Sequence, residues 1–457
     1  MKLKLITTGV IALSLASAAF ADVTVDITGA TAFRAATLEA IKAKFTASGQ
    51  PFQFSHDQAA GAFNGATRSL WKGTFQGLSG VTTIRTSFNG SVQGIRALVD
   101  SPAQDPTYYT DIAANLITAA ANGGGETHTS TPGFLKTVAP SQSEIAFSDV
   151  NKAVTPFAAS PLQPASPAAG VVVFTMLTNE GSPITNVTAQ QFRALLSNGF
   201  QPLHMFTGNN TNTTNVFATG RNDGSGTRTA YLAESGFGVT TPVKQYVTIR
   251  STSTALQAIQ LVPVGGVNSP VTGNLASYVA ATGAYVGIGG NITQSANNAS
   301  TVWSQNVAGN GGYDSGSLLR TDMGKTGTSN VRVFDETGAD SFGASVRADL
   351  VTWLSLNDAV TARGNGAIFC GYNGVRLNDI AVSGPTMSAA DLAKVTQGVY
   401  TAWSYQQMYL RNDITSGDAV TVYDGIKAAI PANLGAAGIA ISDMAVGREE
   451  DGGTVAP

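Results

Sequence analysis

Residues 23–45 read VTVDITGATAFRAATLEAIKAKF, and this stretch decides the fold class. Its first five residues alternate apolar and polar side chains as a half-buried β-strand does, and small residues then turn the chain. Leu38, Ile41 and Phe45 follow at the spacing that places them on one face of a helix. A strand, a tight turn and a helix in this order form the repeating unit of α/β proteins.

The same unit recurs along the chain. Residues 82–88, TTIRTSF, are strand-like, and a turn leads into residues 92–99, whose apolar side chains fall at helical spacing. Residues 143–150, SEIAFSDV, show another strand pattern. Residues 170–176, GVVVFTM, are continuously apolar, as expected for a strand covered on both faces. Strands that alternate with helices predict an α/β protein with mainly parallel sheets.

Three later segments complete the organisation of the chain. A helix is predicted from Thr188, a typical N-cap, to Gly199, a typical stop. Residues 255–345 are rich in glycine, serine and asparagine, and we interpret them as a loop-rich insertion. Residues 397–411, QGVYTAWSYQQMYLR, and 419–430, AVTVYDGIKAAI, are predicted to form a final helical piece.

The first 21 residues have the pattern of a secretory signal peptide. Two lysines precede an apolar stretch at residues 5–16, which ends in Ala-Phe-Ala, and we expect cleavage before Asp22. The apolar core is short for a membrane span, and no later run reaches about 18 apolar residues. We therefore expect a periplasmic or secreted protein with no membrane insertion after signal cleavage.

Composition narrows the range of partners. Charged residues make up 12% of the chain and the formal net charge is -3, whereas about 25% is typical. The missing basic surface argues against nucleic acid as a partner.

A single cysteine, Cys370, excludes an internal disulfide, and the spacing of His56, His128 and His204 predicts no metal site. We expect a monomer without a cofactor.

Residues 221–228, RNDGSGTR, lie where another helix is predicted to begin. A helix begins with unpaired backbone N–H groups and a partial positive charge, so its first turn attracts anions. The glycines let the backbone approach a ligand closely, and Ser225 and Thr227 offer hydroxyl donors. Arg221 adds a guanidinium, which suits a tetrahedral oxyanion. The segment therefore predicts an oxyanion site, and a surface turn with a Ser/Thr helix cap is the alternative.

Residues 221–228 resemble the Arg-Ser-Asp-Gly-Ser-Gly-Thr segment of the phosphate-binding proteins that serve ABC importers, the PstS-like type 2 periplasmic binding proteins. Four more segments are similar to motifs of this family, in its order: TGATAF at 28–33, GSVQG at 90–94, AFSD at 146–149 and QGVYTAWSYQQMY at 397–409. The resemblance implies a two-lobe, periplasmic-binding-protein-like α/β fold. It also implies inorganic phosphate or a related oxyanion as ligand and an ABC transporter permease as partner.

Carried over residue by residue, the resemblance implies ligand contacts from Thr31, Ala32, Phe33, Ser91, Asp149, Arg221, Ser225, Gly226 and Thr227. Thr31 and Ser91 have helix capping as an alternative role, and Asp149 could be a turn residue. The chain departs from the family where Arg34 replaces a proline and Val92-Gln93 breaks a glycine pair. Three insertions also enlarge it, at about residues 55–80, 100–142 and 255–345.

These observations predict two lobes with the ligand between them, where βα turns converge. Lobe 1 is predicted at residues 22–168 and 379–457, and lobe 2 at 169–378. The expected role is capture of the oxyanion and not catalysis. A secreted surface or matrix protein that keeps the fold without binding an oxyanion is the alternative. A secreted hydrolase is disfavoured because histidine is scarce and no activated nucleophile is evident.

Overall fold

The computed structural model describes residues 22–99, 106–110, 124–134, 136–251, 256–261, 292–294, 312–313, 315–324, 330–335, 340–377, 387–435 and 438–457. The predicted signal peptide lies outside the described residues. So do most of the predicted insertion at 255–345 and parts of the one at 100–142. Among the helices that are described, none combines the length and the apolarity needed to cross a bilayer.

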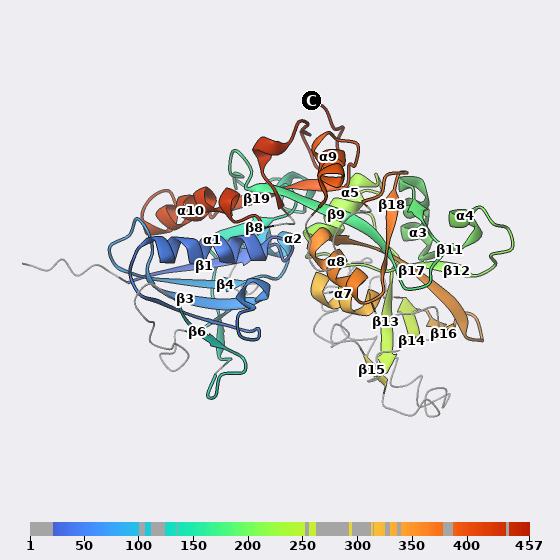
Figure 1. The fold of residues 1–457 in the computed structure, drawn as a ribbon, viewed down its shortest axis with the longest axis horizontal. Helices are drawn as coiled ribbons and strands as arrows, with labels where there is room; N and C mark the ends of the chain where they lie inside the picture. The colour runs from blue at the N-terminus through green and yellow to red at the C-terminus, as the bar shows by residue number, and fades with distance from the viewer. Residues whose placement is uncertain are drawn as a thin grey trace, which may run out of the picture.

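Two lobes lie side by side and join along one edge of the molecule (Figure 1). The sheet of the first lobe contains β1 (Val23–Gly29), β2 (Phe52–His56), β3 (Arg68–Thr74), β4 (Val81–Ser87), β6 (Gly124–His128), β8 (Ile145–Ser148) and β19 (Trp403–Leu410). Its order is β6-β2-β3-β4-β1-β8-β19, with β1 parallel to both of its neighbours. Three helices accompany this sheet: α1 (Arg34–Ala47), α2 (Ser91–Val99) and α10 (Asp418–Ala429).

The second lobe has a mixed sheet in the order β11-β12-β17-β9-β18-β10. Its strands are β9 (Gly170–Thr178), β10 (Asn186–Val187), β11 (Phe200–Pro202), β12 (Asn215–Ala218), β17 (Val346–Ser355) and β18 (Ile368–Tyr372). A smaller group of strands extends below it: β13 (Tyr246–Ser251), β14 (Leu256–Leu261), β15 (Ile292–Gln294) and β16 (Asn330–Phe334). The helices of this lobe are α3 (Ala189–Asn198), α4 (His204–Thr207), α5 (Gly226–Glu234), α7 (Gly316–Met323) and α8 (Leu356–Gly364).

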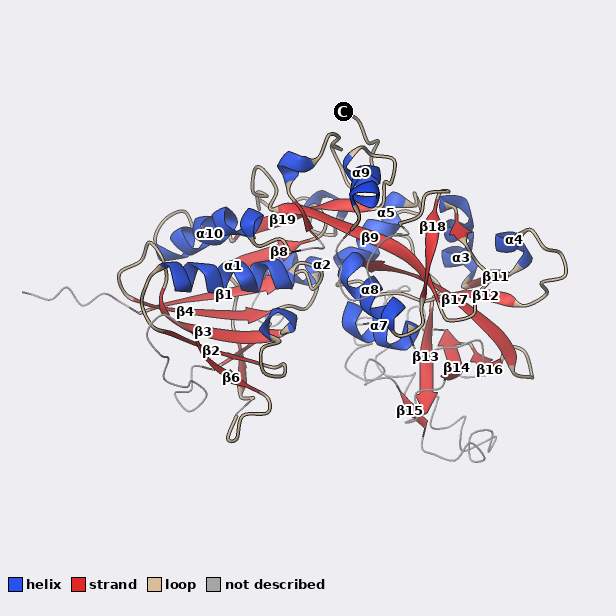
Figure 2. Ribbon diagram, viewed as in Figure 1, coloured by secondary structure: helices blue, strands red, loops and turns tan. Residues whose placement is uncertain are grey.

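The remaining elements are short. They are α9 (Ala389–Thr396), β5 (Thr107–Tyr109), β7 (Val138–Pro140), β20 (Gly438–Ile439) and the 3₁₀ turns Phe63–Gly65, Lys152–Val154, Ile430–Ala432 and Ile441–Asp443. Figure 2 shows that both lobes contain helices and strands. The predicted two-lobe α/β fold is confirmed, although its sheets combine parallel and antiparallel pairs more evenly than "mainly parallel" suggests. We retain 168/169 and 378/379 as proposed lobe boundaries.

Strand β9 connects the lobes. Residues 170–173 pair with β19, which itself continues into the first lobe beside β8, and residues 174–178 pair with β17 of the second lobe. All nine residues of β9 are buried, as the apolar run predicts. The predicted helix at 397–411 is wrong, because Trp403–Leu410 forms β19. This strand is covered on both faces, so its sequence lacks the period-2 alternation of a half-buried strand.

Candidate functional site

Five segments bring the predicted site residues to the junction between the lobes. The turn after β1 carries Thr31, Ala32 and Phe33, the start of α2 carries Ser91, and the end of β8 is followed by Asp149. From the second lobe, Arg221 follows β12, and residues 225–227 begin α5. Seven of these residues form what we call the Arg221 cluster: Thr31, Ser91, Asp149, Arg221, Ser225, Gly226 and Thr227.

Arg221 links the two lobes through its side chain. The side chain is 1% exposed, Nε donates to the Tyr313 carbonyl at 3.0 Å, and Nη1 lies 3.4 Å from Thr31 Oγ1. Its backbone carbonyl accepts from Gln245 Nε2 at 2.9 Å and from Arg228 Nη1 at 3.3 Å. The guanidinium is therefore fixed in orientation from its own lobe, and it points at a hydroxyl of the other.

Ser91, Asp149 and Gly226 pack directly on one another. Ser91 Oγ accepts the Asp149 backbone N–H at 2.9 Å. A Cβ at Gly226 would lie 2.2 Å from Ser91 Oγ and 3.0 Å from the Asp149 Cβ. Only glycine therefore lets the start of α5 approach α2 this closely. Ser225 caps α5, since its hydroxyl accepts the Arg228 N–H at 3.3 Å.

The lobes also touch through their backbones. The Gly224 carbonyl of the second lobe accepts the N–H groups of Val92 at 3.1 Å and of Gln93 at 3.2 Å. These are among the first N–H groups of α2, which have no partner inside the helix. The second lobe therefore completes the hydrogen bonding of a helix in the first lobe, and the Arg221 cluster is closed at this point.

The environment of Asp149 disfavours the ionised form of its carboxyl. It is 2% exposed, and its Oδ1 accepts no hydrogen bond from the described residues. Burial raises the pKa of this carboxyl to about 7, against the opposing effects of Ser91 and Arg221. A buried acceptor without a donor is costly, and a ligand that carries a proton would supply the donor.

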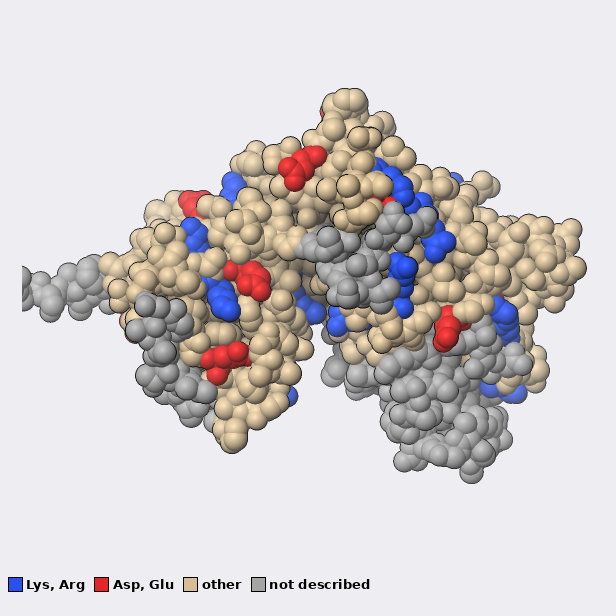
Figure 3. Space-filling model, viewed as in Figure 1, with Lys and Arg blue, Asp and Glu red and all other residues tan. Residues whose placement is uncertain are grey.

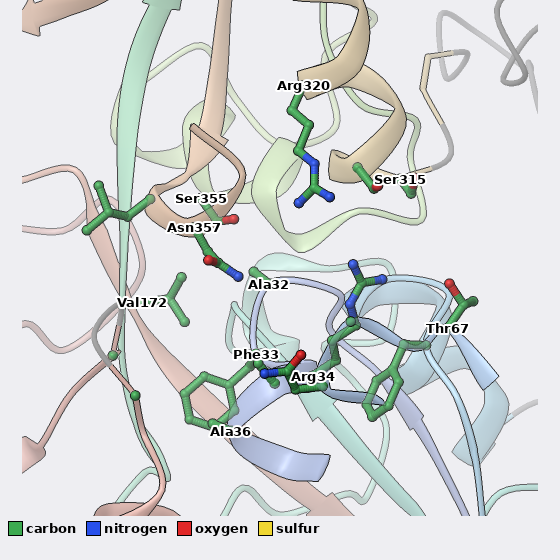
Figure 4. A pocket seen from close by; sticks show the side chains of 18 of the residues that line it. Ala32, Phe33, Arg34, Ala36, Thr67, Val172, Ser315, Arg320, Ser355 and Asn357 are labelled. Carbon is green, nitrogen blue, oxygen red and sulfur yellow. The ribbon is translucent and has the colours of Figure 1, made fainter. Parts of the chain in front are cut away.

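A cavity of about 680 Å³ lies beside the Arg221 cluster, between the lobes; we call it the interlobe cavity. Of the nine predicted residues, Ala32 and Phe33 line it, and the seven members of the cluster do not. Figure 4 shows Arg320 and Ser315 reaching the cavity from the second lobe and Arg34 and Thr67 from the first. In the space-filling view a deep gap separates the lobes, with Lys or Arg side chains on both walls (Figure 3).

Sequence reasoning missed several residues of this cavity. In the sequence Arg34 is marked only as a departure from the family pattern, although it directly follows the predicted Phe33. Arg320 and Ser315 lie in the segment interpreted as an insertion, and Asn357 starts a helix that no motif marks. Only their chemistry could have pointed to them: Arg34, Ser315 and Asn357 lie at helix starts, and Arg320 adds a positive charge in the last turn of α7.

Two histidines that are distant in sequence come together in the first lobe. Strands β2 and β6 pair in parallel with His56 beside His128, and the ring centroids are 6.2 Å apart. His56 Nε2 lies 2.8 Å from Glu126 Oε1, and burial lowers the pKa of His56. Within the described part of the chain, no group of three or more His, Cys, Asp or Glu side chains could hold a metal ion.

Searches with protein-family models and among curated proteins returned no match. Solved structures give similarities over most of the chain. A structure from Clostridium perfringens, described as a phosphate ABC transporter substrate-binding protein with bound phosphate, is 11% identical with a TM-score of 0.42, and the match covers 92% of this chain and 99% of that one. An ABC-type phosphate transport receptor from Vibrio cholerae is 11% identical with a TM-score of 0.37, over 91% and 99% of the two chains. PstS from Borrelia burgdorferi is 11% identical with a TM-score of 0.33, again over 91% and 99%.

Proposed function

We propose that this protein is an exported solute-binding protein that captures phosphate, or a similar tetrahedral oxyanion, between its two lobes for an ABC importer. One observation carries the proposal. Arg221, four hydroxyl side chains and a buried carboxyl with one unpaired oxygen converge from five segments at the junction of the lobes. Charge-assisted hydrogen bonds from fixed donors are the strongest means of holding an oxyanion.

Each group has a distinct role in this proposal. Arg221 supplies the positive charge and paired donors. Thr31 helps to orient the guanidinium, because its hydroxyl accepts a hydrogen bond from Nη1. The N-terminus of α5, at Gly226 and Thr227, supplies backbone N–H groups and a partial positive charge. Asp149 accepts a hydrogen bond from the P–OH group that hydrogen phosphate still carries. Sulfate has no such proton at neutral pH, so an ionised Asp149 would repel it in a poorly screened site.

We propose that the protein binds the oxyanion without catalysing a reaction on it. The Ser91 hydroxyl accepts a backbone N–H, and the Ser225 hydroxyl caps a helix, so both act as structural hydrogen-bond acceptors. None of the seven residues of the Arg221 cluster is a histidine, the side chain that most often acts as general base for a serine nucleophile. Export to the periplasm or beyond follows from the predicted signal peptide and belongs to the same proposal.

The alternative function, a secreted surface or matrix protein without oxyanion binding, has one observation in its favour. Ser91 and Gly226 already touch across the lobes, so the Arg221 cluster is closed. In a binding protein this contact must open to admit the ligand. In a structural protein it would be permanent.

Calorimetry of residues 22–457 against phosphate and sulfate tests the proposal. We expect saturable phosphate binding that is stronger than sulfate binding. Loss of one partner from a buried charge pair costs roughly 2–5 kcal/mol, so Arg221→Ala should weaken phosphate binding at least about tenfold. Arg221→Lys should recover part of it, since the charge returns without the paired donors.

The matched control is Arg193→Ala in the same lobe, whose Nη1 donates to the Ser235 carbonyl far along α5 from the cluster. This variant should bind phosphate as the unmodified protein does. Absence of phosphate binding in the unmodified protein, or an Arg221→Ala variant with unchanged affinity, would favour the surface or matrix protein.

A further inference from the structure

The interlobe cavity is larger than a single tetrahedral oxyanion requires. Its volume of about 680 Å³ falls in the range of roughly 300–1,000 Å³ that holds organic ligands the size of drugs. It adjoins the Arg221 cluster at two points. Ala32 and Phe33, which line it, directly follow Thr31. Ser315 and Ser317, which also line it, flank Gly316, and a Cβ at Gly316 would lie 3.6 Å from Arg221 Nη1.

The charged side chains that line the cavity are all cationic. They are Arg34, Arg68 and Arg320, and among the residues that the structure describes no aspartate or glutamate lines it. Arg320 is neutralised by Asp358, whose Oδ1 lies 2.7 Å from Arg320 Nη1. Arg68 donates to the carbonyl and hydroxyl of Thr107, at 2.8 and 2.9 Å, and not to a carboxylate. Within the described part of the chain, the Arg34 side chain makes no hydrogen bond and no ion pair.

Three helices begin at this cavity. Arg34 is the first residue of α1, whose first turn has no acidic residue and whose N-cap side chain makes no hydrogen bond. The starts of α7, at Ser315 and Ser317, and of α8, at Ser355 and Asn357, line the opposite wall. Each helix N-terminus presents a partial positive charge. The Asp358 carboxylate lies in the first turn of α8 and against Gly316 at the start of α7, so of the three only α1 begins at the cavity without an acidic side chain in or against its first turn.

Arg34 is partly buried at the interlobe cavity. Burial lowers the pKa of its guanidinium, Asp358 and Asp57 oppose this effect, and Arg320 adds to it. An arginine remains protonated under these conditions. Its guanidinium therefore favours any anion that enters the cavity.

We propose that the ligand is a phosphorylated organic anion with a second anionic group, and that the interlobe cavity binds this second group through Arg34 and Arg68. The phosphate group would lie against Arg221 and Thr31. A fully ionised phosphate monoester has no proton to share, so Asp149 would face it in its protonated form, which burial favours. The inference rests on the proposed function, since it extends the same site from a bare oxyanion to an ester. The small polar side chains Thr67, Ser315 and Asn357 would contact the organic part.

Two probes of matched size separate the second charge from the phosphate group. Both 3-phosphoglycerate and glycerol 3-phosphate carry one phosphate on a three-carbon chain, and only the former adds a carboxylate. Calorimetry of residues 22–457 should show at least about tenfold tighter binding of 3-phosphoglycerate, the effect of one charge-assisted contact. Arg34→Gln should abolish this preference, and Arg34→Lys should keep part of it.

Lys44→Gln is the matched control, because it removes one positive charge from the far end of α1, where Lys44 Nζ donates to Gln76. It should leave the preference intact. Equal affinities for the two probes, or a preference that survives in Arg34→Gln, would overturn the inference. If inorganic phosphate still binds in that case, the proposed function stands; if neither phosphate nor either ester binds, both fall.

Discussion

At the scale of a single residue, the ionised form of Asp149 is disfavoured by its position in the candidate site. The carboxyl lies in the buried junction of the lobes beside Ser91, with Oδ1 unpaired among the described residues. Arg221 favours its ionised form, but burial outweighs this effect, and the more distant Asp451 and Asp358 add to the rise in pKa. At neutral pH the group is close to its midpoint, where a ligand can change its protonation state.

In the absence of ligand, Asp149→Asn should stabilise the protein at high pH. The pKa of the carboxyl rises from 3.8 to about 7 on folding. The unfolded state therefore loses this proton first, and the stability of the protein falls as pH rises from about 4 to about 7. Asparagine does not titrate. The variant should be more stable than the unmodified protein at pH 8, by roughly 4 kcal/mol at most, with the gain vanishing near pH 4.

Denaturant unfolding at pH 4 and pH 8 measures this difference. Asp413→Asn serves as a control of opposite sign, because the exposed Asp413 is hydrogen-bonded to Arg411, which lowers its pKa. That variant should lose stability relative to the unmodified protein as pH rises. If Asp149→Asn raises the free energy of unfolding equally at both pH values, the pKa of Asp149 is not raised by folding and the prediction is wrong.

At the scale of elements, helix and strand periodicity predicted β1, β4, β8, α1, α2 and α10 of the first lobe and α3 of the second, but not β2, β3, β6 or β19. Leu38, Ile41 and Phe45 are fully buried on α1, as their spacing requires. Thr188 forms a capping box with Gln191 at the start of α3, and Gly199 ends that helix with a φ of 86°. These features depend on local sequence, so a single chain reveals them.

The candidate site was only partly predictable, since its geometry depends on contacts between distant segments. The motif at 221–228 places a helix start beside an arginine, and the structure confirms that start with Ser225 as its cap. The neighbourhood of Arg34 and Arg320 is different. It arises when α1 and α7, almost 300 residues apart in the chain, face each other across the lobes. No local pattern encodes that approach.

The contact between α2 and α5 yields a prediction at the element scale. Gly226→Ala would place a methyl group 2.2 Å from Ser91 Oγ, so the two helix starts must separate. We expect phosphate affinity to fall about tenfold, because a displacement of this kind misplaces the anion donors. Each lobe should keep its fold, since the added methyl group meets the other lobe.

Gly224→Ala is the matched control in the same turn. A Cβ at Gly224 would meet nothing closer than 3.6 Å, which is an ordinary contact. Calorimetry and thermal unfolding of the two variants separate a loss of binding from a loss of stability. Unchanged phosphate affinity in Gly226→Ala would place the ligand away from the start of α5.

On the scale of the whole molecule, three passages of the chain connect the lobes. Strands β9 and β19 form the shared sheet, and the C-terminal segment reaches both sides. Asp451 Oδ2 accepts the Asn151 N–H of the first lobe at 2.6 Å, while Arg448 pairs with Glu234 of the second at 2.9 Å. These connections all lie on the joined edge, which leaves the opposite edge open. Motion about this edge would open the gap without breaking either lobe.

Phosphate should therefore shift the lobes toward the closed arrangement. An anion between Arg221 and the first lobe interacts with both walls only when they are close, so its binding favours the closed population. Small-angle scattering of residues 22–457 should show a smaller radius of gyration at saturating phosphate than without it. Gly226→Ala, which holds Ser91 and α5 apart, should compact less under the same conditions. An identical profile with and without saturating phosphate would mean that the contact between α2 and α5 is permanent and that the ligand enters without movement of the lobes.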